Sequence, residues 1–263
     1  MRVTVVLDAD ARTAVVERLR AAGCVFAEEE AALVADAAGS PGELAAMVER
    51  RADGVPVEVI VGWAEFCGLR VAVDPGVFVP RRRTEALARA AADAARPGAV
   101  VVDLCCGSGA VGLAVATLSP GVTVHAADID PVAVRCARRN LAPVGGIVHE
   151  GDLFATLPPS LCGGVDVVAV NAPYVPTDQV DLMPPEARLH EPRVALDGGE
   201  DGLDVHRRVA ADARTWLTGG GLLLAECSER QVAAACQVYE GAGLDVSVAI
   251  ADGTSVVTGR SRG

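Results

Sequence analysis

Short apolar runs alternate with helix-like stretches from residue 100 onward. We expect strands at 100–102, 122–127, 147–148 and 165–170, with helices from Ala110 and over 131–141. The later part of the chain predicts strands at 222–225, 246–250 and 255–257, with helices over 203–217 and 231–242. Strands that alternate with helices form a parallel sheet covered on both faces. The sequence therefore predicts an α/β, Rossmann-like fold with a mostly parallel, seven-stranded sheet.

The residues before this region follow other patterns. Apolar side chains recur at helical spacing over residues 10–53. Residues 56–79 hold two β-rich runs, 57–61 and 69–73, separated as the strands of a hairpin would be. We therefore expect a small helical domain over 1–55, a β-hairpin connector over 56–79 and the α/β domain over 80–263.

Composition narrows the possible classes of protein. The chain has 263 residues, 51% of them hydrophobic, which is enough for a large buried core. The short apolar start at Met1–Leu7 runs into Asp8, and no stretch approaches a membrane span, so we expect a cytoplasmic protein. A net charge of -12 predicts no stable nucleic-acid binding. The eight cysteines and four histidines lack ligand spacing, so we expect no metal.

A glycine-rich turn follows the first strand of the α/β part. Gly107–Gly112 matches the GxGxxG pattern, which alone is weak evidence. Asp103 precedes the first glycine by four residues, as in many adenosylmethionine sites, and Asp128 ends the next strand, where a ribose would lie. Asp152, after the third strand, is placed to accept from an adenine amino group, or is an ordinary turn residue. We favour S-adenosylmethionine over NAD as the cofactor.

The tetrapeptide Asn171-Ala172-Pro173-Tyr174 ends the strand at 165–170. An amide or aromatic amine nitrogen is a poor nucleophile, so a site that methylates it must hold its N–H bonds in acceptors. The Asn171 side-chain oxygen and a neighbouring backbone carbonyl can do so. Tyr174 offers a flat face for a planar acceptor. Together with the glycine turn, the tetrapeptide predicts methyl transfer to nitrogen.

Several motifs carry a family resemblance. They are Gly62–Leu69, Val79-Pro80-Arg81 with Thr84-Glu85, His190–Arg193 with Ala195–Leu203, and Gly259-Arg260. With the glycine turn and the tetrapeptide, they make residues 50–260 resemble a protein-(glutamine-N5) methyltransferase of the HemK/PrmC type. The resemblance implies a class I methyltransferase fold, ribose binding by Asp128, a grip on the amide by Asn171, and a substrate-docking role for the helical domain. The family usually has proline where this chain has Ala172, and often glycine at Cys227.

The predicted reaction is methyl transfer from S-adenosylmethionine to a glutamine amide nitrogen in a protein substrate, which is a release factor, a ribosomal protein or another translation-related protein. We expect a monomer that does not bind membranes. The candidate acceptor site is Asn171, Ala172, Pro173 and Tyr174. The candidate cofactor residues are Arg81, Thr84, Asp103, Cys105, Gly107, Gly109, Asp128, Ile129, Asp152, Leu153 and Asn171. Three alternatives stay open: an adenine-N6 methyltransferase acting on DNA or RNA, a small-molecule amine methyltransferase, and a cofactor-binding protein that has lost turnover.

Overall fold

The computed structural model describes residues 8–251 and 254–262. The chain separates into two compact units. The first contains residues up to Trp63 together with Pro184–His190, and the second contains Ala64–Met183 and the rest of the chain. The domain boundaries expected after residues 55 and 79 stay predictions. The segment Met1–Leu7 lies outside the described residues.

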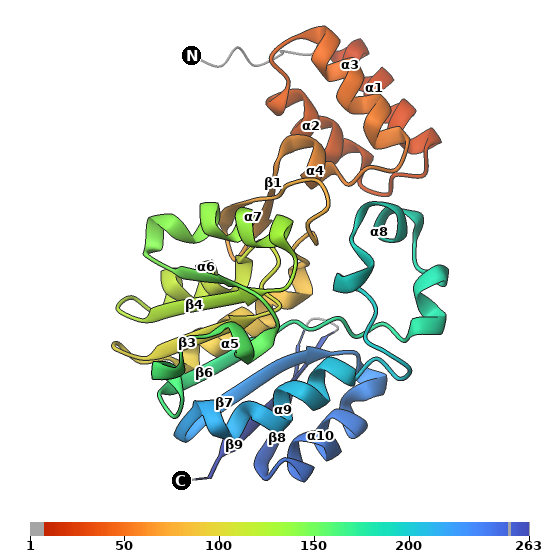
Figure 1. The fold of residues 1–263 in the computed structure, drawn as a ribbon. Helices are drawn as coiled ribbons and strands as arrows, with labels where there is room; N and C mark the ends of the chain where they lie inside the picture. The colour runs from red at the N-terminus through yellow and green to blue at the C-terminus, as the bar shows by residue number, and fades with distance from the viewer. Residues whose placement is uncertain (1–7, 252–253, 263) are drawn as a thin grey trace. The chain divides into compact units, whose positions relative to one another are not determined.

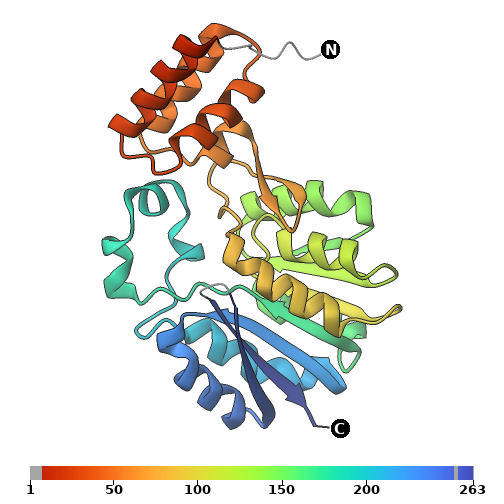
Figure 2. The ribbon, with the colours of Figure 1, turned by 180° about the vertical axis from the view of Figure 1, so that it is seen from behind.

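The second unit is built on a seven-stranded sheet (Figures 1 and 2). Its strand order is β5-β4-β3-β6-β7-β9-β8. The strands are β3 (Val100–Leu104), β4 (Thr123–Asp128), β5 (Ile147–Glu150), β6 (Val165–Val170), β7 (Leu217–Cys227), β8 (Leu244–Ala251) and β9 (Thr254–Ser261). The five strands from β5 to β7 run parallel, and β9 is antiparallel to both of its neighbours. The mostly parallel sheet expected from the sequence is thus confirmed.

Helices cover both faces of this sheet (Figure 1). They are α5 (Glu85–Ala94), α6 (Ala110–Leu118), α7 (Pro131–Leu141), α9 (Asp204–Trp216) and α10 (Val232–Gly241). Side chains alternate between faces along a strand, so Val101 packs with the α5 and α6 core while its neighbour Val102 packs with the α9 and α10 core. Burial on both faces is why these strands are nearly all apolar.

The first unit is helical. It contains α1 (Ala9–Ala21), α2 (Ala27–Ala37), α3 (Pro41–Ala52), α4 (Val57–Val61) and the short α8 (Pro185–His190). Asp8 caps α1 and Ser40 caps α3 through their side-chain oxygens. Within this unit, Arg51 donates from Nε and Nη2 to the two carboxylate oxygens of Glu30, and both side chains are about nine-tenths buried.

One predicted strand is wrong. Residues 57–61 form α4, although their β-branched sequence favours a strand. Val57 and Ile60, three residues apart, are both buried in the helical core, so tertiary packing decides the conformation. The hairpin instead pairs β1 (Trp63–Phe66) with β2 (Leu69–Ala72). Its turn residues Cys67 and Gly68 both have positive φ, as a type I′ turn requires.

The long segment between β6 and α9 is irregular, as its proline content predicts. It contains the short 3₁₀ turns Thr177–Leu182 and Arg193–Ala195 besides α8. Across the described ranges, no helix is both long and apolar enough to cross a membrane.

Candidate active site

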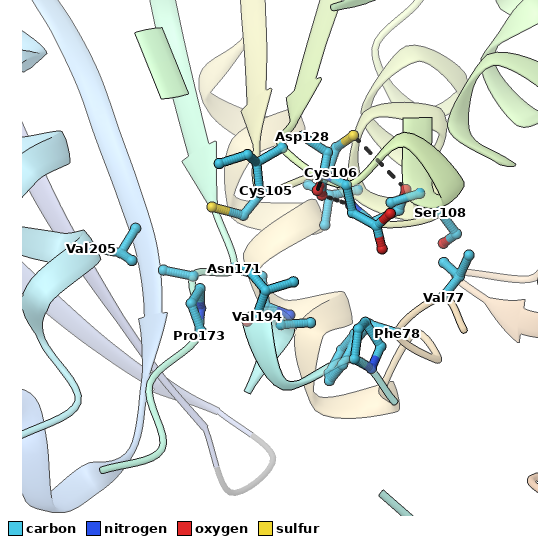
Figure 3. Close-up of a pocket in the computed structure, with 18 of the residues that line it drawn as sticks. Val77, Phe78, Cys105, Cys106, Ser108, Asp128, Asn171, Pro173, Val194 and Val205 are labelled. Atoms are coloured by element: carbon cyan, nitrogen blue, oxygen red, sulfur yellow. Dashed lines mark hydrogen bonds between the residues drawn. The ribbon is translucent and has the colours of Figure 1, made fainter. Parts of the chain in front are cut away.

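The carboxyl ends of β3, β4 and β6 meet at one edge of the sheet, where a cavity of about 210 Å³ opens (Figure 3). Open α/β sheets bind ligands at this edge. The cavity wall contains every predicted site residue except Gly109. Gly109 instead begins α6 with φ 76°, and a Cβ there would lie 3.2 Å from the Ala137 side chain. Gly109 therefore allows α6 to pack closely against α7.

Asp103 is the penultimate residue of β3 and lines the cavity. Its Oδ2 accepts from the Gly112 backbone N–H in α6 at 2.8 Å, and the residue is 1% exposed. Burial is the main cause that raises the pKa of this carboxyl, to about 7. Asp103 therefore changes charge near neutral pH, beside the part of the cavity where a cationic ligand group would be held.

Asp128 is fixed at the end of β4 by two backbone donors. Its Oδ2 accepts from Gly107 N–H at 2.8 Å, and its Oδ1 accepts from Asp130 N–H at 2.9 Å. Burial raises the pKa of this carboxyl as well, while the two backbone hydrogen bonds oppose that rise. Labelled in Figure 3, Asp128 points into the cavity beside Cys105 and Cys106, in a position to accept from a vicinal diol. Burial raises the pKa of the Cys105 thiol too, so it is a neutral packing group here.

Asp152 also lines the cavity. Its carboxylate pairs with Arg208 of α9 at 2.6 Å, with roughly half of each side chain exposed. Leu153 beside it has φ 48°, and Ile129 is 54% exposed on the cavity wall. An apolar pair next to a carboxylate suits a flat heteroaromatic ring with an amino group.

Asn171 follows β6 directly, and its side chain reaches the Thr84 hydroxyl. Nδ2 lies 3.5 Å from Thr84 Oγ1, and Thr84 is 3% exposed at the start of α5. Because the Asn171 nitrogen faces Thr84, its oxygen is left for an incoming N–H donor. Ala172 is 2% exposed, and Figure 3 shows Asn171 and Pro173 at the cavity.

A second loop holds the backbone of this tetrapeptide and its following residue. Val175 N–H donates to Leu196 O at 3.0 Å, and Gly198 N–H donates back to Val175 O at 2.8 Å. A Cβ on Gly202 would collide with the carbonyl of Tyr174, so this glycine is needed for the close approach. The loop after β6 therefore keeps a defined path although Ala172 replaces a ring-restricted proline.

Some residues of the site were not predicted. Phe78, Val194, Val205 and Arg208 line the cavity, and Arg83 reaches Tyr174. Arg81 lies 4.9 Å from the centre of the Phe78 ring and pairs with Glu191 at 2.5 Å. The run Val77–Pro80 before the arginines could have indicated Phe78, whereas nothing in the helical pattern of α9 distinguishes Arg208 from a solvent-exposed arginine.

Among the described residues no group of three or more histidine, cysteine or acidic side chains could hold a metal ion. The carboxylates of Asp103 and Asp128, the tight turn at Gly107 and the apolar wall fit S-adenosylmethionine, with its cation, ribose and adenine. Fold and cavity together define a methyltransferase that uses S-adenosylmethionine.

Known proteins that resemble this chain are methyltransferases as well. Residues 68–200 match the model of the methyltransferase small domain. A release factor glutamine methyltransferase of Streptomyces coelicolor is 41% identical over 70% of this chain and 67% of its own length. One from Cereibacter sphaeroides is 36% identical over 90% of this chain and 91% of its own. The chain belongs to the release factor glutamine methyltransferase family.

Three further proteins are similar to this chain. A 4-amino-L-phenylalanine/4-methylamino-L-phenylalanine methyltransferase of Streptomyces pristinaespiralis is 37% identical over 74% of this chain and 69% of its own length. The crystal structure of a methyltransferase from Pyrococcus furiosus superposes with a TM-score of 0.56 at 16% identity, over 74% of this chain and 90% of that one. The alignment with a Geobacter sulfurreducens relative spans 66% of that protein's length.

Proposed function

We propose that this protein transfers a methyl group from S-adenosylmethionine to the side-chain amide nitrogen (N5) of a glutamine in a release factor. The observation that carries the proposal is the placement of Asn171. Its amide nitrogen faces Thr84 at the mouth of the cofactor cavity, which leaves its oxygen as an acceptor. A primary amide has two N–H bonds, and the Ala172 carbonyl is the second acceptor.

In the proposed reaction, residues of the chain orient the acceptor amide. Asn171 and the Ala172 carbonyl hold both N–H bonds and so fix the plane and the lone-pair direction of the amide. Tyr174 packs against that plane. The cofactor supplies an electrophilic sulfonium methyl group, which the glutamine nitrogen attacks in line. No strong base is required, because the nitrogen becomes acidic only as it is methylated and its proton can leave afterwards.

Ala172 affects this arrangement through the backbone alone. Pro173 restricts Ala172 to extended conformations, and the hydrogen bonds between Val175 and the loop at 196–198 fix the chain on its other side. A carbonyl in this position is available from any residue type. We therefore infer that the loss of the family proline lowers preorganisation only slightly.

A second candidate acceptor is a small aromatic amine. The relative from Streptomyces pristinaespiralis is named for such a substrate, and its 37% identity lies within the range of the release factor enzymes. An arylamine nitrogen shares a delocalised lone pair with the amide, so the same two acceptors serve it. Adenine-N6 transfer is disfavoured by the net charge of -12, and the intact Asp103, Asp128 and Asn171 argue against a protein that has lost turnover.

The partners follow from the substrate. We propose that the helical unit docks the protein substrate, that the enzyme acts as a monomer and that it forms no stable complex with nucleic acid. Because translation takes place in the cytoplasm, we also propose that the enzyme is cytoplasmic.

The experiment is transfer of methyl label from S-adenosylmethionine to purified release factors and to 4-amino-L-phenylalanine in parallel. The expected result is label in one release factor that maps by mass spectrometry to N5-methylglutamine. Label only in the arylamine would replace the proposal by the second candidate. Label in neither, with S-adenosylhomocysteine still bound, would contradict both.

Asn171→Ala is the control variant for this assay. It should lower kcat by about 10²–10³-fold, because one preorganised hydrogen-bonding group at the reacting nitrogen is lost. The dissociation constant for S-adenosylhomocysteine, measured by calorimetry, should change less than about threefold. An unchanged kcat would remove Asn171 from the acceptor site.

A further inference from the structure

Tyr174 is held at both its phenol oxygen and its backbone carbonyl. Arg83 Nη2 donates to the phenol oxygen at 2.6 Å, and the guanidinium carbon lies 6.0 Å from the ring centre. Gln231 Nε2 donates to the Tyr174 carbonyl oxygen at 2.8 Å. Two side chains from outside the tetrapeptide therefore hold Tyr174, Arg83 at the ring and Gln231 at the main chain.

Arg83 is itself held by Glu226, the penultimate residue of β7. Its Nε donates to Glu226 Oε1 at 3.2 Å. Glu226 is 1% exposed, and its Oε2 has no hydrogen-bond partner among the described residues. The Arg83 side chain is 45% exposed, so packing alone does not hold it. A buried carboxylate with one charged neighbour favours strongly the conformation that keeps that neighbour close.

Gln231 uses its whole hydrogen-bonding capacity. Oε1 accepts from the Ser228 backbone at 3.2 Å and from its hydroxyl at 2.7 Å. Nε2 donates to the carbonyls of Tyr174 and, at 3.0 Å, Asp201. An amide bonded on both sides cannot turn without losing a bond. Glu226 and Gln231 belong to one short segment, residues 226–231, which comprises the last two residues of β7 and the turn that leads to α10.

We propose that segment 226–231 contains positioning residues for the acceptor, which act through Tyr174. Glu226 fixes the ring by way of Arg83, and Gln231 fixes the main chain of the same residue. The inference rests on the proposed function, because it concerns the plane against which the acceptor packs. Neither residue touches the acceptor or lines the cofactor side. Their removal should therefore lower kcat and leave cofactor affinity unchanged.

The test is a double-mutant cycle of Glu226→Gln and Tyr174→Phe, measured as kcat for methylation of the release factor. Each single variant should lower kcat by roughly tenfold, since small misplacements of an acceptor cost about 10–10²-fold. The double variant should be no slower than the slower single one, because a ring without the phenol oxygen no longer transmits the constraint. Arg82→Gln, at the exposed neighbour of Arg83, should keep wild-type kcat.

Two results would overturn the proposal: losses that multiply in the double variant, or a Glu226→Gln enzyme with wild-type kcat. Binding of S-adenosylhomocysteine shows that each variant is folded. If Glu226→Gln does not fold, Arg83→Met takes its place in the same cycle with the same expected outcomes. A wild-type enzyme that transfers nothing to glutamine is a different result, which contradicts the proposed function and this inference with it.

The pKa of the Tyr174 phenol gives a measurement that does not depend on turnover. Burial raises the pKa of Tyr174, and the Glu226 carboxylate raises it further, against an opposing effect of Arg83. Glu226→Gln should therefore lower this pKa, seen as phenolate absorbance that is absent from the Tyr174→Phe background. An unchanged titration would show that Glu226 does not act on Tyr174.

Discussion

At the scale of single residues, Asp103 is the group whose ionisation matters most for the cofactor site. Burial raises its pKa to about 7, from an ordinary value of 3.8. Between about pH 4 and pH 7 the folded protein therefore holds a proton at Asp103 that the unfolded chain has released. Stability from this group is present at low pH and is lost as pH rises from about 4 to about 7.

Replacement of Asp103 by asparagine should remove this pH dependence of stability. Between pH 5.5 and 8 the free energy of unfolding of the wild-type protein should fall by about 2 kcal/mol more than that of Asp103→Asn, at about 1.4 kcal/mol per pH unit below the folded-state pKa. Urea denaturation at several pH values measures the difference. Parallel curves for the two proteins would show that Asp103 is already ionised at pH 5.5.

The same carboxyl should govern cofactor affinity in the opposite direction. A neutral Asp103 offers less attraction to a cationic ligand group, so the dissociation constant of S-adenosylmethionine should rise below pH 7 in the wild type. Asp103→Asn should bind weakly at every pH and show no such inflection. Calorimetric titration between pH 6 and 8 tests both, and an inflection that persists in the variant would assign it to another group.

At the scale of elements, the loop after β6 keeps its path because a second loop approaches it closely. Gly202 has φ 78° and no room for a Cβ against the Tyr174 carbonyl, whereas Gly220 has φ 85° with nothing within 4 Å of a Cβ. An alanine would therefore meet a similar left-handed backbone at both positions, but only at Gly202 would its Cβ collide with neighbouring atoms.

Gly202→Ala should lower kcat by about 10²-fold, because it displaces the backbone that carries the acceptor site. Gly220→Ala should cost only the strain of a left-handed alanine, roughly 1 kcal/mol of stability, with kcat unchanged. Steady-state kinetics and thermal unfolding of the two variants give the comparison. Equal kcat in both would mean that the close approach is not needed for turnover.

The sequence predicted the helices and strands whose conformation depends on local interactions, and it missed those that depend on contacts between distant residues. The strands of the sheet and the helices between them follow from local patterns, and the structure confirms them. Residues 57–61 form a helix because Val57 and Ile60 are buried against other helices, which no local pattern shows. Arg208, Glu226 and Gln231 reach partners 30 to 143 residues away, so only the folded chain brings them to the site.

At the scale of the whole molecule, two units carry separate cores and should differ in what destabilises them. The helical unit contains the buried Arg51–Glu30 pair and the exposed Arg18–Glu49 pair, at 2.7 Å each. Loss of Glu30 leaves the buried Arg51 guanidinium with Glu186 at 3.6 Å and the Val55 carbonyl at 3.4 Å, while an exposed pair contributes little.

Glu30→Ala should therefore destabilise the helical unit by about 1.5–3 kcal/mol, the range for a hydrogen bond to a charged group, and Glu49→Ala by less than about 1 kcal/mol. Hydrogen exchange resolved by segment measures both. In Glu30→Ala, binding of S-adenosylhomocysteine should persist while methylation of an intact release factor falls. If a short glutamine peptide and the intact protein were affected equally, the helical unit would have no part in docking.

The position of β9 between β7 and β8 has a consequence for synthesis. The outer edge of β7 and the whole of β8 leave the ribosome before the strand that pairs with both of them. Until Thr254–Ser261 is made, the growing chain exposes two unpaired strand edges, a state prone to pairing with other chains. Glu226, on β7, comes to lie opposite Val256 only then. The sheet is therefore complete only once β9, which follows both of its neighbours in the chain, has been made.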